Sequence, residues 1–346
     1  MKDSYGRTID YMRISITDRC NLRCKYCMPY GVDCVEPRNI LTFEEIWAIA
    51  ICGAGLGIRH VKVTGGEPLV RKDCCQLIQM LKSIPGIEKV TLTTNGVLLE
   101  RYLEPLLKAG VDGINISLDT RNRNMYEEIT GSDCLEAVLR GIRLASESGI
   151  PVKVNAVSID FEEGPGCSWK SVAELAREYP VDVRFIEMMP IGYGRNFKTI
   201  NHQVLLEEME KEYPGLCRDD RPHGFGPAVY YQIPGFQGSI GLISAIHGKF
   251  CENCNRVRLT SQGYLKTCLC FEDGVNLREV LREGQAESET GSGHWKWRYQ
   301  SCPGETMLQE RLAEAMSQAI LRKPAAHCFE TPGRITEMRN MVDIGG

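Results

Sequence analysis

Short β-rich runs alternate with amphipathic helical patterns through the first half of the chain. Six of these runs have the length and composition of strands: Tyr11–Thr17, His60–Thr64, Lys89–Thr93, Gly113–Leu118, Pro151–Val157 and Val181–Glu187. Such alternation is typical of repeated βα units around a parallel sheet. The pattern therefore predicts an α/β fold with six parallel strands as its framework.

Helix signals lie between and after these runs. Thr42 and Glu45 form a capping-box pattern, which marks the start of a helix. A second helix is predicted after Asp133, where apolar residues recur at helical spacing. A third is predicted at 309–323, ahead of Pro324.

The predicted strands share an unusual feature, because alternate positions along them are polar. These positions are Arg13, Ser15, His60, Lys62, Thr91, Thr93, Asn115, Ser117, Lys153, Asn155, Asp182 and Arg184. A parallel sheet covered by helices on both faces would be apolar in both phases. The pattern predicts an incomplete, TIM-like (β/α)6 barrel whose inner wall faces a polar ligand. A half-solvated sheet is the alternative.

After Glu187 the periodic pattern gives way to frequent glycine and proline, and further cysteines follow between Cys251 and Cys270. We predict two domains, a barrel at 1–235 and a smaller cysteine-bearing domain at 236–346. The segment 283–304 is rich in Gly, Ser and Glu, which is typical of a flexible insertion or linker.

The charge balance limits the classes of partner. The 346 residues include 41 basic and 45 acidic side chains, a net charge of −4. This balance argues against a general nucleic-acid surface, so a polyanionic ligand would need a local basic site. The longest apolar stretch, Ile46–Ile58, is too short to span a bilayer. We expect a cytoplasmic protein with neither nucleic acid nor membrane as partner.

Sixteen cysteines without a secretion signal indicate metal binding rather than disulfides. The first cysteine motif (Cys20, Cys24 and Cys27) directly follows the first strand, so we expect it at the carboxyl end of the sheet. Structural zinc needs four ligands, whereas three thiolates on a four-iron cluster leave one iron open. The alternative is a zinc site with a remote fourth ligand.

The second cysteine set (Cys251, Cys254 and Cys268) again has three members, and Arg256 and Arg258 lie within it. Arginines provide paired donors for phosphate groups. Four more cations fall in the polar strand phase and would line the same cavity: Arg13, Lys62, Lys153 and Arg184. For each cation alone, a solvated surface position is the alternative. Cys270 is predicted to be a bystander, since the set is complete without it.

Two motifs together carry a resemblance to known proteins. The first cysteine motif, followed one βα unit later by the segment Thr64–Pro68 with Gly65-Gly66-Glu67, resembles the radical S-adenosylmethionine (SAM) superfamily. The second cysteine set, with Cys254–Thr260, is similar to the GTP 3′,8-cyclase family of molybdenum cofactor biosynthesis. The resemblance extends from Arg13 to Gly346.

The resemblance implies two 4Fe-4S clusters, one on each cysteine group, with SAM bound at the open iron of the first. It also implies the reaction of a lyase. A 5′-deoxyadenosyl radical removes hydrogen from ribose C3′ of GTP, and ring closure at guanine C8 gives (8S)-3′,8-cyclo-7,8-dihydroguanosine 5′-triphosphate. The second cluster would anchor guanine through its open iron.

The family's motifs also assign residues. SAM would be bound by Tyr26, Gly66, Glu67, Ser117 and Met189. GTP would be bound by Arg13, Lys62, Thr93, Lys153, Arg256, Val257 and Arg258, and the polar strand phase adds Arg184. A catalytic role is expected for Arg256, Arg258, Gly345 and Gly346. The chain departs from the family at Lys62, commonly arginine, and at His60, commonly lysine.

Partners follow from the same resemblance. They are a flavodoxin- or ferredoxin-like electron donor and cyclic pyranopterin monophosphate synthase, which receives the product; a homodimer is one compatible oligomeric state. Two other functions stay open. One is a radical SAM peptide maturase with an auxiliary cluster, which Arg256, Arg258 and the final Gly-Gly disfavour. The other is a non-catalytic iron-sulfur protein or zinc scaffold.

Overall fold

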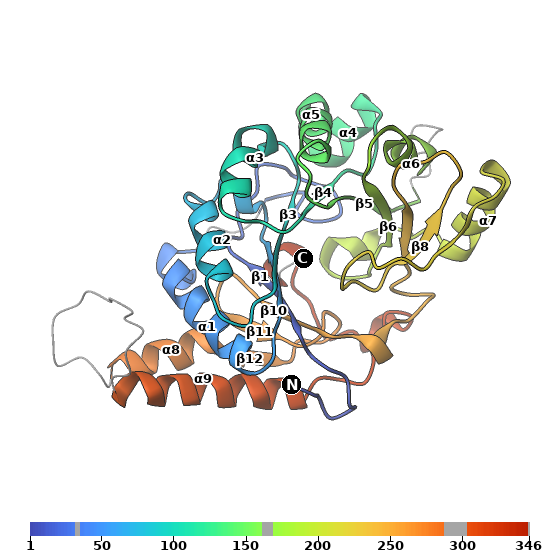
Figure 1. Ribbon diagram of the computed structural model, residues 1–346. Helices are drawn as coiled ribbons and strands as arrows, with labels where there is room; N and C mark the ends of the chain where they lie inside the picture. Colours follow the sequence, from blue (N-terminus) through green and yellow to red (C-terminus); the bar gives the residue numbers. More distant parts are fainter. Residues whose placement is uncertain (32–34, 161–168, 287–302, 345–346) are drawn as a thin grey trace.

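The computed structural model describes residues 1–31, 35–160, 169–286 and 303–344. Its framework is one twelve-stranded sheet in the order β12-β11-β10-β1-β2-β3-β4-β5-β6-β9-β8-β7. The six central strands are parallel and follow chain order (Figure 1). They are β1 (Tyr11–Ser15), β2 (His60–Thr64), β3 (Lys89–Thr94), β4 (Ile114–Ser117), β5 (Val152–Ser158) and β6 (Asp182–Glu187). All six predicted strands are confirmed.

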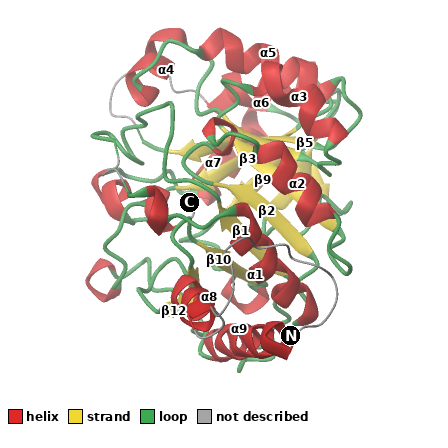
Figure 2. Ribbon diagram, turned by 90° about the vertical axis from the view of Figure 1, so that its left-hand side faces the viewer, coloured by secondary structure: helices red, strands yellow, loops and turns green. Residues whose placement is uncertain are grey.

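Helices cover the outer side of this sheet (Figures 1 and 2). They are α1 (Phe43–Gly55), α2 (Cys74–Lys82), α3 (Leu99–Lys108), α4 (Arg123–Thr130), α5 (Leu135–Ser146) and α6 (Trp169–Glu178). The capping box of α1 is confirmed, since Glu45 N donates to Thr42 Oγ1 at 3.2 Å and Thr42 N donates to Glu45 Oε2 at 2.8 Å. The predicted helix after Asp133 is α5. The apolar strand phase and these helices form one continuous core.

Strands from the second half of the chain extend both edges of the six-stranded sheet. Beyond β6 lie β9 (Ile240–Ile243), which is parallel to it, and then β8 (Val229–Gln232) and β7 (Cys217–Asp219). Beyond β1 lie the parallel β10 (Arg256–Leu259), then β11 (Tyr264–Lys266) and β12 (Gly274–Asn276). Because β1 pairs with β10 and β6 pairs with β9, the first and last of the six strands do not pair with each other, and the six strands form the predicted incomplete barrel. The predicted domain division at 235/236 falls between β8 and β9 of this sheet.

The polar strand phase is internal. Lys62, Asn115 and Arg184 are 7–8% exposed. Arg184 Nε donates to Asn155 Oδ1 at 2.9 Å, and the Asn115 amide oxygen can accept from Arg184 Nη2 at 3.0 Å. The half-solvated sheet is therefore wrong, because these polar side chains contact one another inside the barrel.

The remaining helices are α7 (His202–Glu212), α8 (Leu277–Ala286) and α9 (Pro303–Leu321). Helix α9 contains most of the predicted 309–323 helix and begins earlier. The predicted linker 283–304 is partly wrong, since α8 continues through 286 and α9 starts at 303; residues 287–302 lie outside the described residues. No helix within the described ranges is long and apolar enough to cross a membrane.

Candidate functional site

A cavity of about 360 Å³ lies at the carboxyl ends of the barrel strands. Its lining includes all six predicted cluster cysteines: Cys20, Cys24, Cys27, Cys251, Cys254 and Cys268. The first group follows the carboxyl end of β1, whereas Cys251 and Cys254 precede the parallel β10 and Cys268 follows the antiparallel β11, so the second group lies at the opposite end of these strands. The structure thus places two three-thiol groups around one space.

The first cysteine motif forms a tight loop after β1. Cys27 N donates to Cys24 O at 2.9 Å, and Arg23 N and Lys25 N donate to the end of α4 at 2.8 and 2.9 Å. Burial raises the pKa of Cys27 to about 12 and that of Cys24 well above its ordinary value. These thiols are therefore neutral on their own. Bound iron would supply the positive charge that favours the thiolate forms.

The second cysteine set lies on the opposite side of the cavity from the first motif. Cys251 opens the short helix η5 (Cys251–Asn253), Cys254 N donates to Cys251 O at 3.1 Å, and Cys268 follows β11. Burial opposes ionisation of Cys254, but nearby Lys323 and hydrogen bonding outweigh it and lower the thiol pKa. Lys323 was missed by sequence reasoning; it lines the cavity and donates to Arg256 O at 3.0 Å.

The donor sets fit iron-sulfur clusters. Within the described part of the chain, no three Cys, His, Asp or Glu side chains converge on a point where they could share a single metal ion. A multi-iron cluster takes one thiolate on each of several irons, so its ligands do not have to meet at one point. Three sulfur donors facing a common cavity on either side match this requirement.

The glycines after β2 are required by close backbone packing. A Cβ atom on Gly65 would lie 2.7 Å from Thr17 O, and one on Gly66 would lie 2.7 Å from Asp18 O. Gly66 N donates to Thr17 O at 2.7 Å, and Glu67 N donates to Arg19 O at 2.8 Å. Any side chain here would push the segment away from the first cysteine motif.

Glu67 does not line the cavity. Its carboxylate accepts from Thr94 Oγ1 at 2.8 Å, from Asn95 N at 2.6 Å and from Leu69 N at 3.0 Å. Burial raises the pKa of this carboxyl group to about 7. In this structure Glu67 ties the glycine segment to the end of β3, so a contact with SAM would need the side chain to turn.

The other predicted SAM residues do line the cavity: Tyr26, Gly66, Ser117 and Met189. Tyr26 Oη donates to Asp119 Oδ2 at 2.6 Å, and Asp119 Oδ1 accepts from Val157 N at 2.8 Å. Sequence reasoning missed Asp119, although its place just after the fourth strand was a usable signal. Asp119 fixes the aromatic ring beside the first cysteine motif.

Four predicted GTP residues line the cavity: Arg13, Thr93, Arg256 and Arg258. Arg13 Nε and Thr93 Oγ1 are buried without a hydrogen-bond partner. Burial and neighbouring cations lower the pKa of Arg13 to about 10 and that of Arg258 to about 9. A bound polyanion would relieve this repulsion and accept from the unpaired donors.

The other predicted GTP residues do not line the cavity. Val257 is fully buried in the core on the opposite side of β10 from its arginine neighbours, so only its backbone could contact a ligand. Lys62 and Arg184 are buried in the internal polar layer. His60 stands where the family commonly has lysine, and its ring stacks on Phe225 with the ring centroids 3.4 Å apart.

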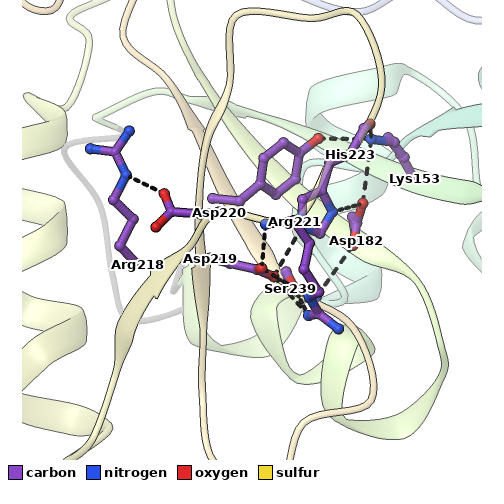
Figure 3. Close-up of polar contacts among 9 residues, drawn as sticks. Lys153, Asp182, Arg218, Asp219, Asp220, Arg221, His223 and Ser239 are labelled. Atoms are coloured by element: carbon purple, nitrogen blue, oxygen red, sulfur yellow. Dashed lines mark hydrogen bonds and ion pairs between the residues drawn. The ribbon is translucent and has the colours of Figure 1, made fainter.

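Lys153 belongs to a polar network with Asp182, Asp219 and His223 (Figure 3), and none of these residues lines the cavity. Its Nζ donates to Tyr230 Oη at 2.9 Å and to His223 O, and lies 3.3 Å from Asp182 Oδ2. His223 in turn bridges Asp182 and Asp219, with both ring nitrogens 2.9 Å from a carboxylate oxygen. Burial and Arg184 lower the pKa of Lys153 to about 8. Its donors are already occupied within the protein.

The C-terminal segment reaches the same cavity. His327 and Phe329 line it, His327 N donates to Cys251 Sγ at 3.4 Å, and Met341 and Val342 of η7 (Met341–Ile344) also line it. Gly345 and Gly346 lie outside the described residues. The described tail therefore ends at the cavity wall.

Comparison with protein families divides the chain in two. Residues 14–163 match the Radical SAM superfamily, and residues 181–329 match the family described as Molybdenum Cofactor Synthesis C.

Full-length relatives share these parts. The chain is 40% identical to a GTP 3′,8-cyclase of Clostridium perfringens and 40% identical to one of Alkaliphilus oremlandii, each over 100% of both chains. It is 37% identical to the Molybdenum cofactor biosynthesis protein 1 of Drosophila melanogaster, covering 96% of this chain and 55% of that protein. Streptococcus suis SuiB, solved with S-adenosylmethionine, has the same fold with a TM-score of 0.58 at 14% identity, over 97% of this chain and 77% of SuiB.

Proposed function

We propose, from the premise that this chain belongs to the GTP 3′,8-cyclase family of the radical SAM superfamily, that its two cysteine groups hold two 4Fe-4S clusters on either side of bound GTP. As a member, it is a GTP 3′,8-cyclase of molybdenum cofactor biosynthesis that uses a 4Fe-4S cluster and SAM. The observation that carries the two-cluster proposal is the single cavity lined by six cysteines and three arginines.

The first cysteine motif would hold the SAM-binding cluster, and the second cysteine set would hold the auxiliary one. When bound, the first cluster and SAM supply the 5′-deoxyadenosyl radical that removes the hydrogen at ribose C3′. Tyr26, Ser117 and Met189 would orient SAM, since they line the cavity. Gly66 also lines the cavity and would contribute its remaining backbone surface.

The triphosphate would lie among Arg13, Arg256 and Arg258. Their guanidinium groups hold the negative charge fixed, which keeps the ribose in one position while C3′ bonds to C8. Thr93 Oγ1 supplies a further unpaired donor. Lys62, Lys153 and Arg184 would reach the phosphates after rearrangement of the internal polar layer, and Lys153 would give up one of its present partners.

The proposed partners follow from family membership. A flavodoxin- or ferredoxin-like protein would deliver electrons, and the product would pass to cyclic pyranopterin monophosphate synthase. We also propose that Gly345 and Gly346 close the substrate pocket, because the described tail ends at the cavity wall.

The test is to incubate the anaerobically reconstituted protein with SAM, dithionite and GTP, and to identify the nucleotide product. We expect the 3′,8-cyclised nucleotide and 5′-deoxyadenosine. Release of 5′-deoxyadenosine with GTP recovered unchanged would contradict the proposed placement of the substrate, and iron content would be measured on the same sample.

A further inference from the structure

Two cysteines outside both cluster groups have their sulfur atoms in contact. Cys270 Sγ lies 3.3 Å from Cys328 Sγ, and Cys328 N donates to Cys270 Sγ at 3.3 Å. Cys270 is fully buried, whereas Cys328 is half-buried. Neither lines the cavity, so the pair is separate from the six cysteines that face it.

We propose that Cys270 and Cys328 are a thiol modification site that forms a reversible disulfide with a low-molecular-weight disulfide as the oxidant. A disulfide bond is about 2.05 Å long, so the sulfur atoms have to approach by only about 1.3 Å. A backbone N–H from one partner already contacts the sulfur of the other. The fold therefore holds the two thiols at reacting distance.

Glutathione disulfide can act as the oxidant in a two-step thiol–disulfide exchange. The half-buried Cys328, as thiolate, attacks one glutathione sulfur, and the S–S bond breaks to release the first glutathione. Cys270 then attacks the Cys328 sulfur and displaces the second glutathione. The protein loses two electrons and the two thiol protons end on two glutathione molecules, so glutathione disulfide is reduced.

The location gives the bond a structural consequence. Both cysteines belong to a small apolar cluster that also contains Phe329, Ile335 and Ile344. Cys270 precedes β12, and Cys328 belongs to the C-terminal segment, whose Met341 and Val342 line the cavity. The disulfide would fasten that segment to the sheet, so oxidation would fix one wall of the cavity.

The test treats the anaerobic, iron-loaded full chain with glutathione disulfide, blocks free thiols and maps peptides by mass spectrometry. We expect a dithiothreitol-sensitive link between the Cys270 and Cys328 peptides with unchanged iron content. The thermal unfolding midpoint should rise in the oxidised wild type. Cys217→Ser, which changes an exposed cysteine, is the matched control and should retain the link.

The two single variants should behave differently, because Cys270 is fully buried and Cys328 is half-buried. Cys270→Ser should leave Cys328 as a mixed disulfide with glutathione, whereas Cys328→Ser should leave the buried Cys270 unmodified. Recovery of both wild-type cysteines as blocked free thiols would overturn the proposal. So would a link that appears only as iron is lost, or loss of half the iron in either variant, since these results would place the sulfurs at the auxiliary cluster.

Discussion

Glu337→Gln should destabilise the protein, because Glu337 is the buried anchor of the C-terminal segment. Its carboxylate accepts a hydrogen bond from Lys266 Nζ at 2.5 Å. It accepts two more from Arg339 Nε and Nη2, each at 3.0 Å. Lys266 is 0% exposed and Glu337 is 1% exposed. The substitution keeps the shape of the side chain but leaves a buried ammonium without a negative partner.

The magnitude follows from this burial. Removing one partner of a buried ion pair costs about 3–5 kcal/mol. The glutamine oxygen can still accept a hydrogen bond, so we expect the lower end, about 3 kcal/mol, or roughly a 150-fold change in the unfolding equilibrium. At roughly 2–4 °C per kcal/mol for large domains, the midpoint should fall by about 6–12 °C.

The assay is anaerobic thermal unfolding of the iron-loaded protein at several pH values. Burial opposes ionisation of Glu337, but hydrogen bonds from Arg339 and Lys266 outweigh it and hold the carboxyl pKa below its usual value. The stabilisation is therefore fully present above the unfolded pKa of about 4.3 and is lost as pH falls through the lowered folded pKa. The difference between variant and wild type should be full at pH 7 and should shrink in acid.

Two further variants separate the ion pair from a general effect of substitution. Glu330→Gln removes a surface carboxylate that pairs with Lys249 and should cost well under 1 kcal/mol. Lys266→Met combined with Glu337→Met should recover much of the lost stability, because no buried charge is left unpaired. A wild-type midpoint for Glu337→Gln at pH 7, or a double variant less stable than the single one, would refute the reasoning.

Four other outcomes test the site. Serine in place of the three residues of the second cysteine set should lower the iron content from about eight to about four per chain, whereas serine in the first cysteine motif should abolish SAM cleavage; unchanged iron in the former would contradict two clusters. Arg258→Ala should weaken GTP binding by about 1.5–3 kcal/mol in isothermal titration and leave SAM binding unaltered. Lys153→Met should weaken GTP binding by about 1.5–3 kcal/mol, and the surface variant Lys249→Met is the control. Equal GTP affinity in these two variants would show that Lys153 does not contact the phosphates. Deleting Gly345 and Gly346 should preserve iron content and SAM cleavage while lowering cyclised product per 5′-deoxyadenosine, so an unchanged ratio and rate would show the tail to be dispensable.

Features that depend on local spacing could be predicted from the sequence. The six parallel strands follow from their periodicity, and their polar phase correctly indicated an internal wall. The cysteine groups were recognisable because their members are close in sequence, and the first group directly follows a strand. The first group lies at the carboxyl end of the sheet, as expected, whereas the position of the second group at the amino end of β10 could not be predicted from its spacing.

Features that depend on distant pairing could not be predicted. Nothing near Lys153 in sequence indicates that His223 O and Tyr230 occupy its donors. Glu67 shows the same limit, because its carboxylate faces the end of β3 rather than the cavity. The partner of Cys270 is 58 residues away, and the spacing of the second cysteine set gave no information about it.

The two sheet edges determine the order in which the molecule can be assembled during translation. Residues of β1 pair on their outer side with β10, and β6 pairs outward with β9. A ribosome therefore releases the whole six-stranded core, with the first three cysteines, while both edges still present unpaired N–H and C=O groups. We expect chaperones to hold this half-made chain and iron delivery to follow chain completion, because the walls that carry Cys251, Cys254 and Cys268 and the C-terminal segment are synthesised after this core.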